Sequence, residues 1–292
     1  SSGGTADTVQ ASTAGWTTSA STGETLTIRC TDTLTATWNT NIYRLEVGNA
    51  SYALSASGGG VIIDGLQIRV TGQNTNDQAG LLVTGVAANE TAVVKNCLIQ
   101  GSNQSTYRER PLSLNVGTTR TIHCYNTIVY NVGTTVAFSA CTYIATAGGV
   151  VVLYKCVFNG GYYNQRFSST VDILAKNCIF NGASTGFAFG AFPWNANSDY
   201  NATDLSSGLY GGANERLNQT FTFTDSANGD FTLTKDDTGA KGYGVDLSGD
   251  TPSVTTDRLG EVLESPFDIG AYQFLGGGIV VPFNLLQTLG SL

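Results

Sequence analysis

Four segments of the chain repeat one alternation of apolar and polar positions. They align without gaps, at residues 91–99, 121–129, 150–158 and 172–180. In each segment, small or apolar side chains recur at every second position, which is the periodicity of a β-strand with one buried face. Equivalent positions in successive segments lie 30, 29 and 22 residues apart. A strand pattern that recurs at this spacing predicts the coils of a parallel β-solenoid.

One polar position within the repeat predicts a bend. It is occupied by Asn96, Asn126, Lys155 and Asn177. Asn adopts left-handed backbone conformations more readily than most residues that carry a side chain. Because the coils stack about 4.8 Å apart, equivalent amides can hydrogen bond along the stack, as they do in cross-β structures. We expect Lys155 to interrupt this ladder, and Asp64 to occupy the same bend one coil earlier.

The position after the bend predicts a column of buried thiols. Cys97, Cys156 and Cys178 share it, and Thr127 takes it in the remaining segment. The chain has six cysteines but no C-x-x-C pair, so no metal site is predicted. We expect reduced cysteines that behave as small buried hydrophobic residues.

Composition supports an all-β fold. Charged residues make up 12% of the chain, Gly numbers 36 and Met is absent. No stretch shows the apolar spacing of a helix over three turns. From about residue 195 the sequence becomes turn-rich and acidic. We predict a leading segment or N-terminal cap at 1–23, a parallel β-helix at 24–194, a β-rich C-terminal cap at 195–275, and a Gly hinge with an apolar tail at 276–292.

The tail is predicted to be a docking segment. It follows Gly276–Gly278, carries no charge, and has its apolar side chains at Ile279, Val280, Val281, Phe283, Leu285 and Leu286. In water such a segment favours aggregation, so it must be buried. Its own coils or another subunit could bury it, and the glycines favour the other subunit.

Charge and motifs limit the partners. The net charge is −8, and the few Lys and Arg residues are scattered, so nucleic acid is not a predicted partner. No apolar run reaches 18 residues, so no membrane span is predicted. Dinucleotide and P-loop motifs are absent from the sequence, and no cofactor is predicted.

Two groups of residues are candidates for binding. Tyr162, Tyr163, Gln165 and Arg166 combine aromatic, amide and guanidinium groups, which suit contact with a glycan or a subunit, although the segment could also only close a coil. Tyr125 and Tyr154 lie between Lys95 and Lys176 in an outward stripe. This stripe suits contact with a sugar, or is an ordinary solvated strand face.

Catalytic residues are not predicted. A glycosidase needs two carboxylates at a defined separation. In the alignment Asp172 has no acidic neighbour, and Asp64 has a bend role. His123 is the only histidine, and no nucleophile motif lies near it.

The C-terminal region adds a family resemblance. The segments Asp230–Leu233 (DFTL) and Asp268–Tyr272 (DIGAY), with SDYNATD at 198–204, resemble the end of right-handed parallel β-helix proteins of bacteria and tailed phages. Gln273 stands where that family has Glu, and Asp237–Gly239 where it has SPA. The resemblance implies a right-handed β-helix with a C-terminal cap and an extended apolar tail.

The resemblance to these β-helix proteins also implies a function. We expect a non-enzymatic virion protein (a decoration, fibre or spike component), present in several copies, attached to other virion proteins through its tail, and displaying a host- or glycan-binding surface. One alternative is a polysaccharide depolymerase, either a lyase or a glycosidase. A second is a secreted adhesin that is extracellular or on the bacterial cell surface.

Overall fold

The computed structural model describes most of the chain. The described residues are 6–13, 25–48, 50–58, 60–71, 77–84, 90–103, 105–145, 148–168, 171–189, 194–209 and 211–275. The predicted docking tail, Ile279–Leu286, and most of the predicted leading segment lie outside them.

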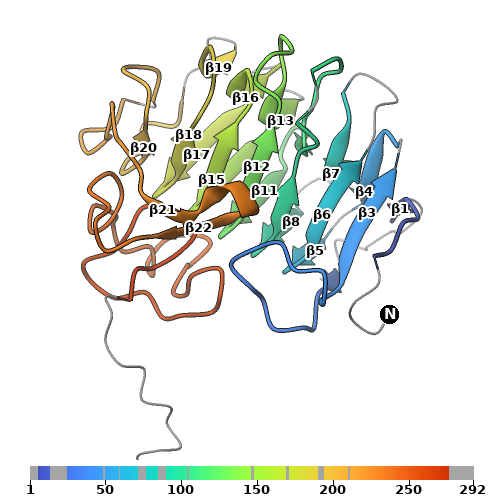
Figure 1. The fold of residues 1–292 in the computed structure, drawn as a ribbon, viewed down its shortest axis with the longest axis horizontal. Helices are drawn as coiled ribbons and strands as arrows, with labels where there is room; N and C mark the ends of the chain where they lie inside the picture. The colour runs from blue at the N-terminus through green and yellow to red at the C-terminus, as the bar shows by residue number, and fades with distance from the viewer. Residues whose placement is uncertain are drawn as a thin grey trace, which may run out of the picture.

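Three parallel sheets make up the body of the molecule (Figure 1). Sheet I contains β1 (Ala11–Ser12), β4 (Tyr52–Ser57), β7 (Ala79–Thr84), β10 (Leu112–Asn115), β13 (Ala140–Ala145), β16 (Tyr163–Phe167) and β19 (Gly186–Phe189). Sheet II contains β2 (Leu26–Arg29), β5 (Val61–Asp64), β8 (Thr91–Lys95), β11 (Thr121–Tyr125), β14 (Val150–Tyr154) and β17 (Asp172–Lys176). Sheet III contains β3 (Arg44–Gly48), β6 (Gln67–Thr71), β9 (Leu98–Gln100), β12 (Ile128–Val132), β15 (Val157–Gly160), β18 (Ile179–Asn181) and β20 (Ala202–Thr203).

The chain visits the sheets in a fixed order. Within the described residues it passes from sheet II to sheet III to sheet I in six successive coils, β2–β3–β4 through β17–β18–β19. Within these six coils, neighbours in a sheet are therefore three strands apart along the chain, and every pair is parallel. The all-β, parallel solenoid-like architecture is confirmed.

The pairing of sheet II confirms the sequence alignment. Thr121 pairs with Thr91 on one side and Val150 on the other, and Val150 pairs with Asp172. The alignment holds because the inward side chains of each strand must meet those of the next coil. A slip of one residue would turn every apolar side chain outward.

The predicted bend lies between sheets II and III. Asn96, Asn126, Lys155 and Asn177 have φ of 57°, 51°, 49° and 54°, the left-handed region that Asn tolerates. The expectation for Asp64 was wrong by one position. Asp64 pairs with Lys95, and Gly65, with φ of 73°, occupies the bend.

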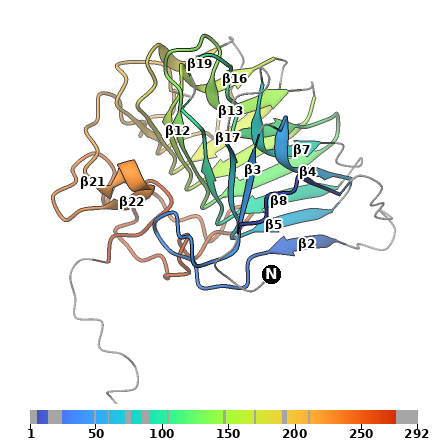
Figure 2. The same ribbon diagram turned by 45° about the vertical axis from the view of Figure 1, so that its right-hand side comes forward.

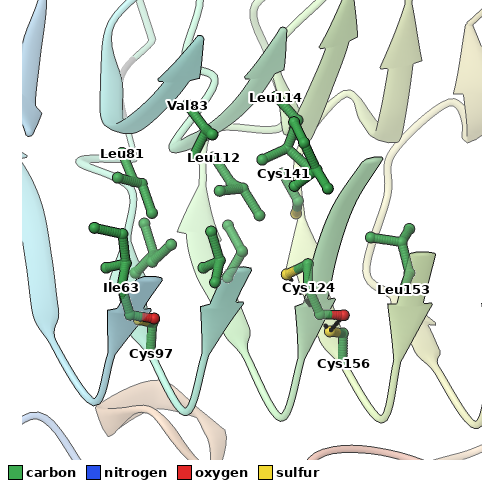
Figure 3. Close-up of a cluster of buried hydrophobic side chains, with 14 of the residues drawn as sticks. Ile63, Leu81, Val83, Cys97, Leu112, Leu114, Cys124, Cys141, Leu153 and Cys156 are labelled. Carbon is green, nitrogen blue, oxygen red and sulfur yellow. Dashed lines mark hydrogen bonds between the residues drawn. The ribbon is translucent and has the colours of Figure 1, made fainter. Parts of the chain in front are cut away.

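The interior between the sheets is apolar and contains the thiols. All six cysteines are free and buried. Cys97, Cys156 and Cys178 are fully buried, and Figure 3 shows Cys97 and Cys156 pointing into the space below Leu81 and Leu114. The Sγ atoms of Cys124 and Cys156 lie 3.9 Å apart.

The stack continues past the predicted boundary at residue 194. Ala202 pairs with Ile179, which places Tyr200 at the bend position, and its φ is 58°. Partly buried side chains of Trp194, Leu205 and Leu209 then pack against the end of the core. The stretch of about ten residues that follows residue 194 therefore belongs to the stack and covers its last layer.

Residues 211–275 lie along one side of the stack (Figures 1 and 2). Their buried side chains pack on outward residues of sheet III, as Phe231, Ile269 and Tyr272 do in a cluster with Ile128 and Val157. The region is less rich in strand than predicted. It has one antiparallel pair, β21 (Phe223–Asp225) and β22 (Asp230–Leu233), joined by the 3₁₀ turn Ser226–Asn228.

Buried carboxylates hold these turns in place of strand hydrogen bonds. Asp237 Oδ1 accepts hydrogen bonds from the backbone N–H groups of Gly239, Ala240 and Lys241. Asp257 and Asp268 accept backbone hydrogen bonds in the same way. This explains why so many acidic residues fall in a turn-rich region, because carboxylates can satisfy backbone donors that no strand pairs.

Candidate binding surface

The outward face of sheet I carries a cluster of arginine and aromatic side chains. Tyr143 pairs with Arg166, and Arg166 with Phe189, so three successive coils place these side chains next to one another. We call the arginine–aromatic patch the group Arg110, Phe138, Tyr143, Tyr163, Arg166 and Phe189.

Three aromatic rings surround the guanidinium of Arg166. Its carbon lies 4.9 Å from the ring centroid of Phe138, 5.4 Å from that of Tyr143 and 5.9 Å from that of Phe189. Phe138 and Phe189 meet edge to face at 4.8 Å. Such ring faces attract a cation through their quadrupole.

Arg110 lies on the other side of Tyr143. Its guanidinium carbon is 3.8 Å from the ring centroid, and its Nη2 forms an ion pair of 2.7 Å with Asp77. Arg108 also pairs with Asp77, at 3.2 Å. Two arginines, Arg108 and Arg110, therefore share the carboxylate of Asp77.

Arg166 has a different environment from the other two. Within the described part of the chain, no residue forms an ion pair or a hydrogen bond with its guanidinium group. Its Nε and Nη1 are enclosed by protein and have no hydrogen-bond partner among the residues that the structure describes. Burial lowers the pKa of Arg166, because water is removed from the charged form.

The patch has two further unusual features. Phe138 has φ of 72°, a conformation that is strained for a bulky residue and is often associated with function. Phe189 is 40% exposed, although most large apolar side chains of the coils are buried. An exposed ring beside a desolvated cation is a composition found at interface hot spots.

The structure places the predicted binding residues in different environments. Tyr163 lies in the patch, and Tyr162 packs on its ring at 5.1 Å. Gln165 is fully buried, so it cannot contact a ligand from solution. Sequence reasoning missed Phe138, Tyr143 and Phe189, although runs such as TVAFSAC and GFAFGAF indicate strands of the same sheet.

The predicted outward stripe of Lys and Tyr residues is present on sheet II, but the C-terminal region covers most of it. Tyr125 pairs with Lys95 and Tyr154, and Tyr154 with Lys176. Tyr154 is only 1% exposed, because Leu247 and Val254 of the C-terminal region cover it. Tyr154 is therefore not a surface binding residue, and Tyr125 is half-buried beside the same cluster.

A groove lies where this stripe meets the last coil. It has a volume of about 840 Å³ and is lined by Lys176, Asp199, Tyr200, Gly212 and Asp250 among others. A second hollow of about 440 Å³ continues from it across Tyr200 and is lined by Glu215. Acidic residues thus lie beside the stripe. Lys176 forms an ion pair of 2.9 Å with Asp250.

Glu215 has a pKa well above the ordinary value of a glutamate. Its two oxygens accept hydrogen bonds from the backbone N–H and the amide of Asn201, at 3.1 and 3.0 Å. Burial nevertheless raises the pKa of Glu215 to about 7. Among the described residues, no group of three or more His, Cys, Asp or Glu side chains could hold a metal ion.

Comparisons with known proteins were made at three levels. No family model, curated protein sequence or solved structure matches the chain. In the described part of the chain, no helix is long and apolar enough to cross a membrane.

Proposed function

We propose that the chain is a non-enzymatic structural protein of a phage virion, built as a right-handed parallel β-helix, that binds a partner or host surface through the arginine–aromatic patch. The proposal combines the solenoid architecture with the resemblance of DFTL and DIGAY to phage and bacterial β-helix proteins. A solenoid suits such a role because it presents a long rigid face.

The patch is the observation that carries the proposal. It brings an exposed Phe189, a desolvated Arg166 and several other rings together on one face. Aromatic and arginine side chains dominate the energy of protein interfaces, and they are enriched where a partner docks. The other virion proteins are the proposed attachment partners of the tail.

Attachment tests the proposal. Particles would carry either Phe189→Ser or the matched control Val262→Ser, which changes an apolar residue that is 61% exposed outside the patch. We expect the patch variant to lose at least tenfold in adsorption to host cells or in incorporation into particles, and the control to behave as wild type. Equal behaviour of the two variants, or absence of the protein from purified particles by mass spectrometry, would contradict the proposal.

A depolymerase is the second candidate, and the groove is the observation that favours it. Asp199 and Asp250 line the groove, and Glu215, with its raised pKa, lines the adjoining hollow. Glycoside hydrolysis uses one carboxyl group with a raised pKa and one that stays ionised. Release of reducing ends from a polysaccharide, abolished in Asp199→Asn, would favour this candidate over the structural one.

A further inference from the structure

We propose that the arginine–aromatic patch binds an anionic group, a carboxylate or a sulfate, through the guanidinium of Arg166. The inference rests on the proposed function, because it specifies the ligand chemistry of the same surface.

The first observation is that Arg166 forms no ion pair with the described residues. Removing a cation from water is costly unless it is paired and hydrogen-bonded. Cation–π contacts offset only part of such a cost. Among the described residues, Nε and Nη1 of Arg166 have no hydrogen-bond partner, and no carboxylate forms an ion pair with Nη2. A buried unpaired donor in a folded protein calls for a specific cause, and an absent ion is one such cause.

The second step is the contrast with Arg110. Both guanidinium groups lie against the ring of Tyr143, at 3.8 and 5.4 Å. Arg110 has an oxygen of Asp77 at 2.7 Å, whereas among the described residues Asp77 attracts Arg166 without forming an ion pair with it. The patch therefore already shows one arginine, ring and carboxylate arrangement. A carboxylate from outside would complete a second one around Arg166.

The third step is the local charge. Three arginines (Arg108, Arg110 and Arg166) against Asp77 leave two positive charges at this place, on a chain whose net charge is −8. The carboxylate of Glu109 accepts hydrogen bonds from the backbone of Ser102 and Gly133, and it is not among the charges that act on Arg110 and Arg166. A positive site on an acidic protein attracts anions selectively and repels cations.

Planar anions fit the donor geometry. A guanidinium donates in a fixed fork that matches the oxygens of a carboxylate, and hydrogen bonds between ionised partners are about twice as strong as neutral ones. The exposed ring of Phe189 next to Arg166 can contact the apolar part of the molecule that carries the anion.

Isothermal titration with small probes tests the inference. The probes are inorganic sulfate, glucuronate and the neutral sugar glucose. We expect sulfate and glucuronate to bind the wild-type chain with an affinity that falls as NaCl is added, and glucose not to bind. Tighter binding of glucuronate than of sulfate would identify a carboxylate carried by a sugar. Equal binding would identify the anion alone as the ligand.

Three variants assign the binding to Arg166. Arg166→Gln should weaken anion binding at least tenfold, and Arg166→Lys should recover part of it. The matched control Arg29→Gln removes an exposed arginine on β2 and should change nothing. Thermal unfolding of each variant shows whether it is folded.

The inference fails if no anion binds, if glucose binds as well as glucuronate, or if Arg166→Gln binds as wild type does. Its failure is distinguishable from that of the proposed function. Loss of attachment in Phe189→Ser, without any anion binding to the wild type, would leave the function standing and overturn only the ligand class.

Discussion

At the scale of single residues, the bend between sheets II and III determines how the coils stack. Asn126 Nδ2 donates to Asn96 Oδ1 at 3.3 Å, and Asn96 Nδ2 donates to Asp64 Oδ1 at 2.8 Å. The ladder stops at Lys155, as the sequence predicted, and Asn126 Oδ1 is buried with no hydrogen-bond partner among the described residues. Lys155 is fully buried and donates to the backbone carbonyl of Asp268 at 2.8 Å.

Lys155→Asn should extend the ladder and remove a buried cation. Burial lowers the pKa of Lys155 to about 8 from 10.5. The unfolded chain therefore binds more protons between these values, and the wild type gains stability as the pH rises from 8 to 10.5. We expect the variant to lose this gain and to be more stable than wild type at pH 7. Urea unfolding across this pH range measures both effects.

The exposed Lys235→Asn is the control, and it should keep the wild-type dependence on pH. A Lys155→Asn variant that is less stable at pH 7, with the same pH dependence as wild type, would show that the contact with Asp268 outweighs the ladder.

At the scale of elements, the last coil is closed by a polar contact that replaces a thiol. Asn201 occupies the position after the bend, where Cys178 lies one coil earlier, and Cys178 N donates to Asn201 Oδ1 at 2.9 Å. Glu215 binds Asn201 from the other side. The pair ends the column of buried side chains with a satisfied hydrogen-bond network.

Glu215→Gln should change the pH dependence of stability. The pKa of Glu215 is raised to about 7 from 4.5, so the folded chain binds the extra proton between these values. The stabilising effect of protonation is fully present below pH 4.5 and is lost as the pH rises through 7. We expect the variant to lack this loss, measured as the urea midpoint between pH 4.5 and 8. The exposed Asp236→Asn should behave as wild type.

The sequence predicts the coils of sheet II well because their strands are buried on the same side in every coil, which enforces one register. It predicts the patch poorly. Phe138 lies in the turn before β13, Tyr143 lies on β13 and Phe189 lies on β19, and no repeated residue aligns these three positions. Tyr200 at the bend was also missed, because an aromatic residue in a left-handed position gives no sequence signal of a turn.

At the scale of the whole molecule, the C-terminal region joins distant coils. Arg258 is 1% exposed, and its Nη1 donates to the carbonyl of Thr35 at 2.6 Å and to the hydroxyl of Tyr272 at 3.1 Å. Tyr272 in turn donates to the carbonyl of Ala36 at 3.1 Å. The sequence could not place this region along the side of the stack, because many of its partners lie from 68 to 236 residues away and share no periodic pattern with it.

Arg258→Ala should loosen the C-terminal region from the first coils. The variant loses hydrogen bonds and leaves buried acceptors unpaired, which should lower the free energy of unfolding by about 3 kcal/mol. Equilibrium urea unfolding measures the change. The exposed Lys235→Ala should have no effect, and a shift of less than a few tenths of a kcal/mol in Arg258→Ala would contradict the joining role.

The docking tail gives a prediction for assembly. Deleting residues 276–292 should leave thermal unfolding unchanged and abolish attachment or oligomerisation, measured by analytical ultracentrifugation and by incorporation into particles. Replacing six of the apolar tail residues with Ser, at full length, should have the same effect; these are Ile279, Val280, Val281, Phe283, Leu285 and Leu286. Unchanged assembly in both variants would rule out the tail as the attachment segment.

The enclosed thiol column is the claim on which the coil architecture depends, and thiol accessibility tests it most directly. Burial raises the pKa of the Cys97 thiol to about 12 and that of Cys156 well above its ordinary value, so neither access nor ionisation favours reaction. We predict that an aqueous thiol reagent labels none of the six cysteines in the native protein and all six after denaturation. Rapid labelling of Cys97, Cys156 or Cys178 in the native protein would contradict the stacked coils.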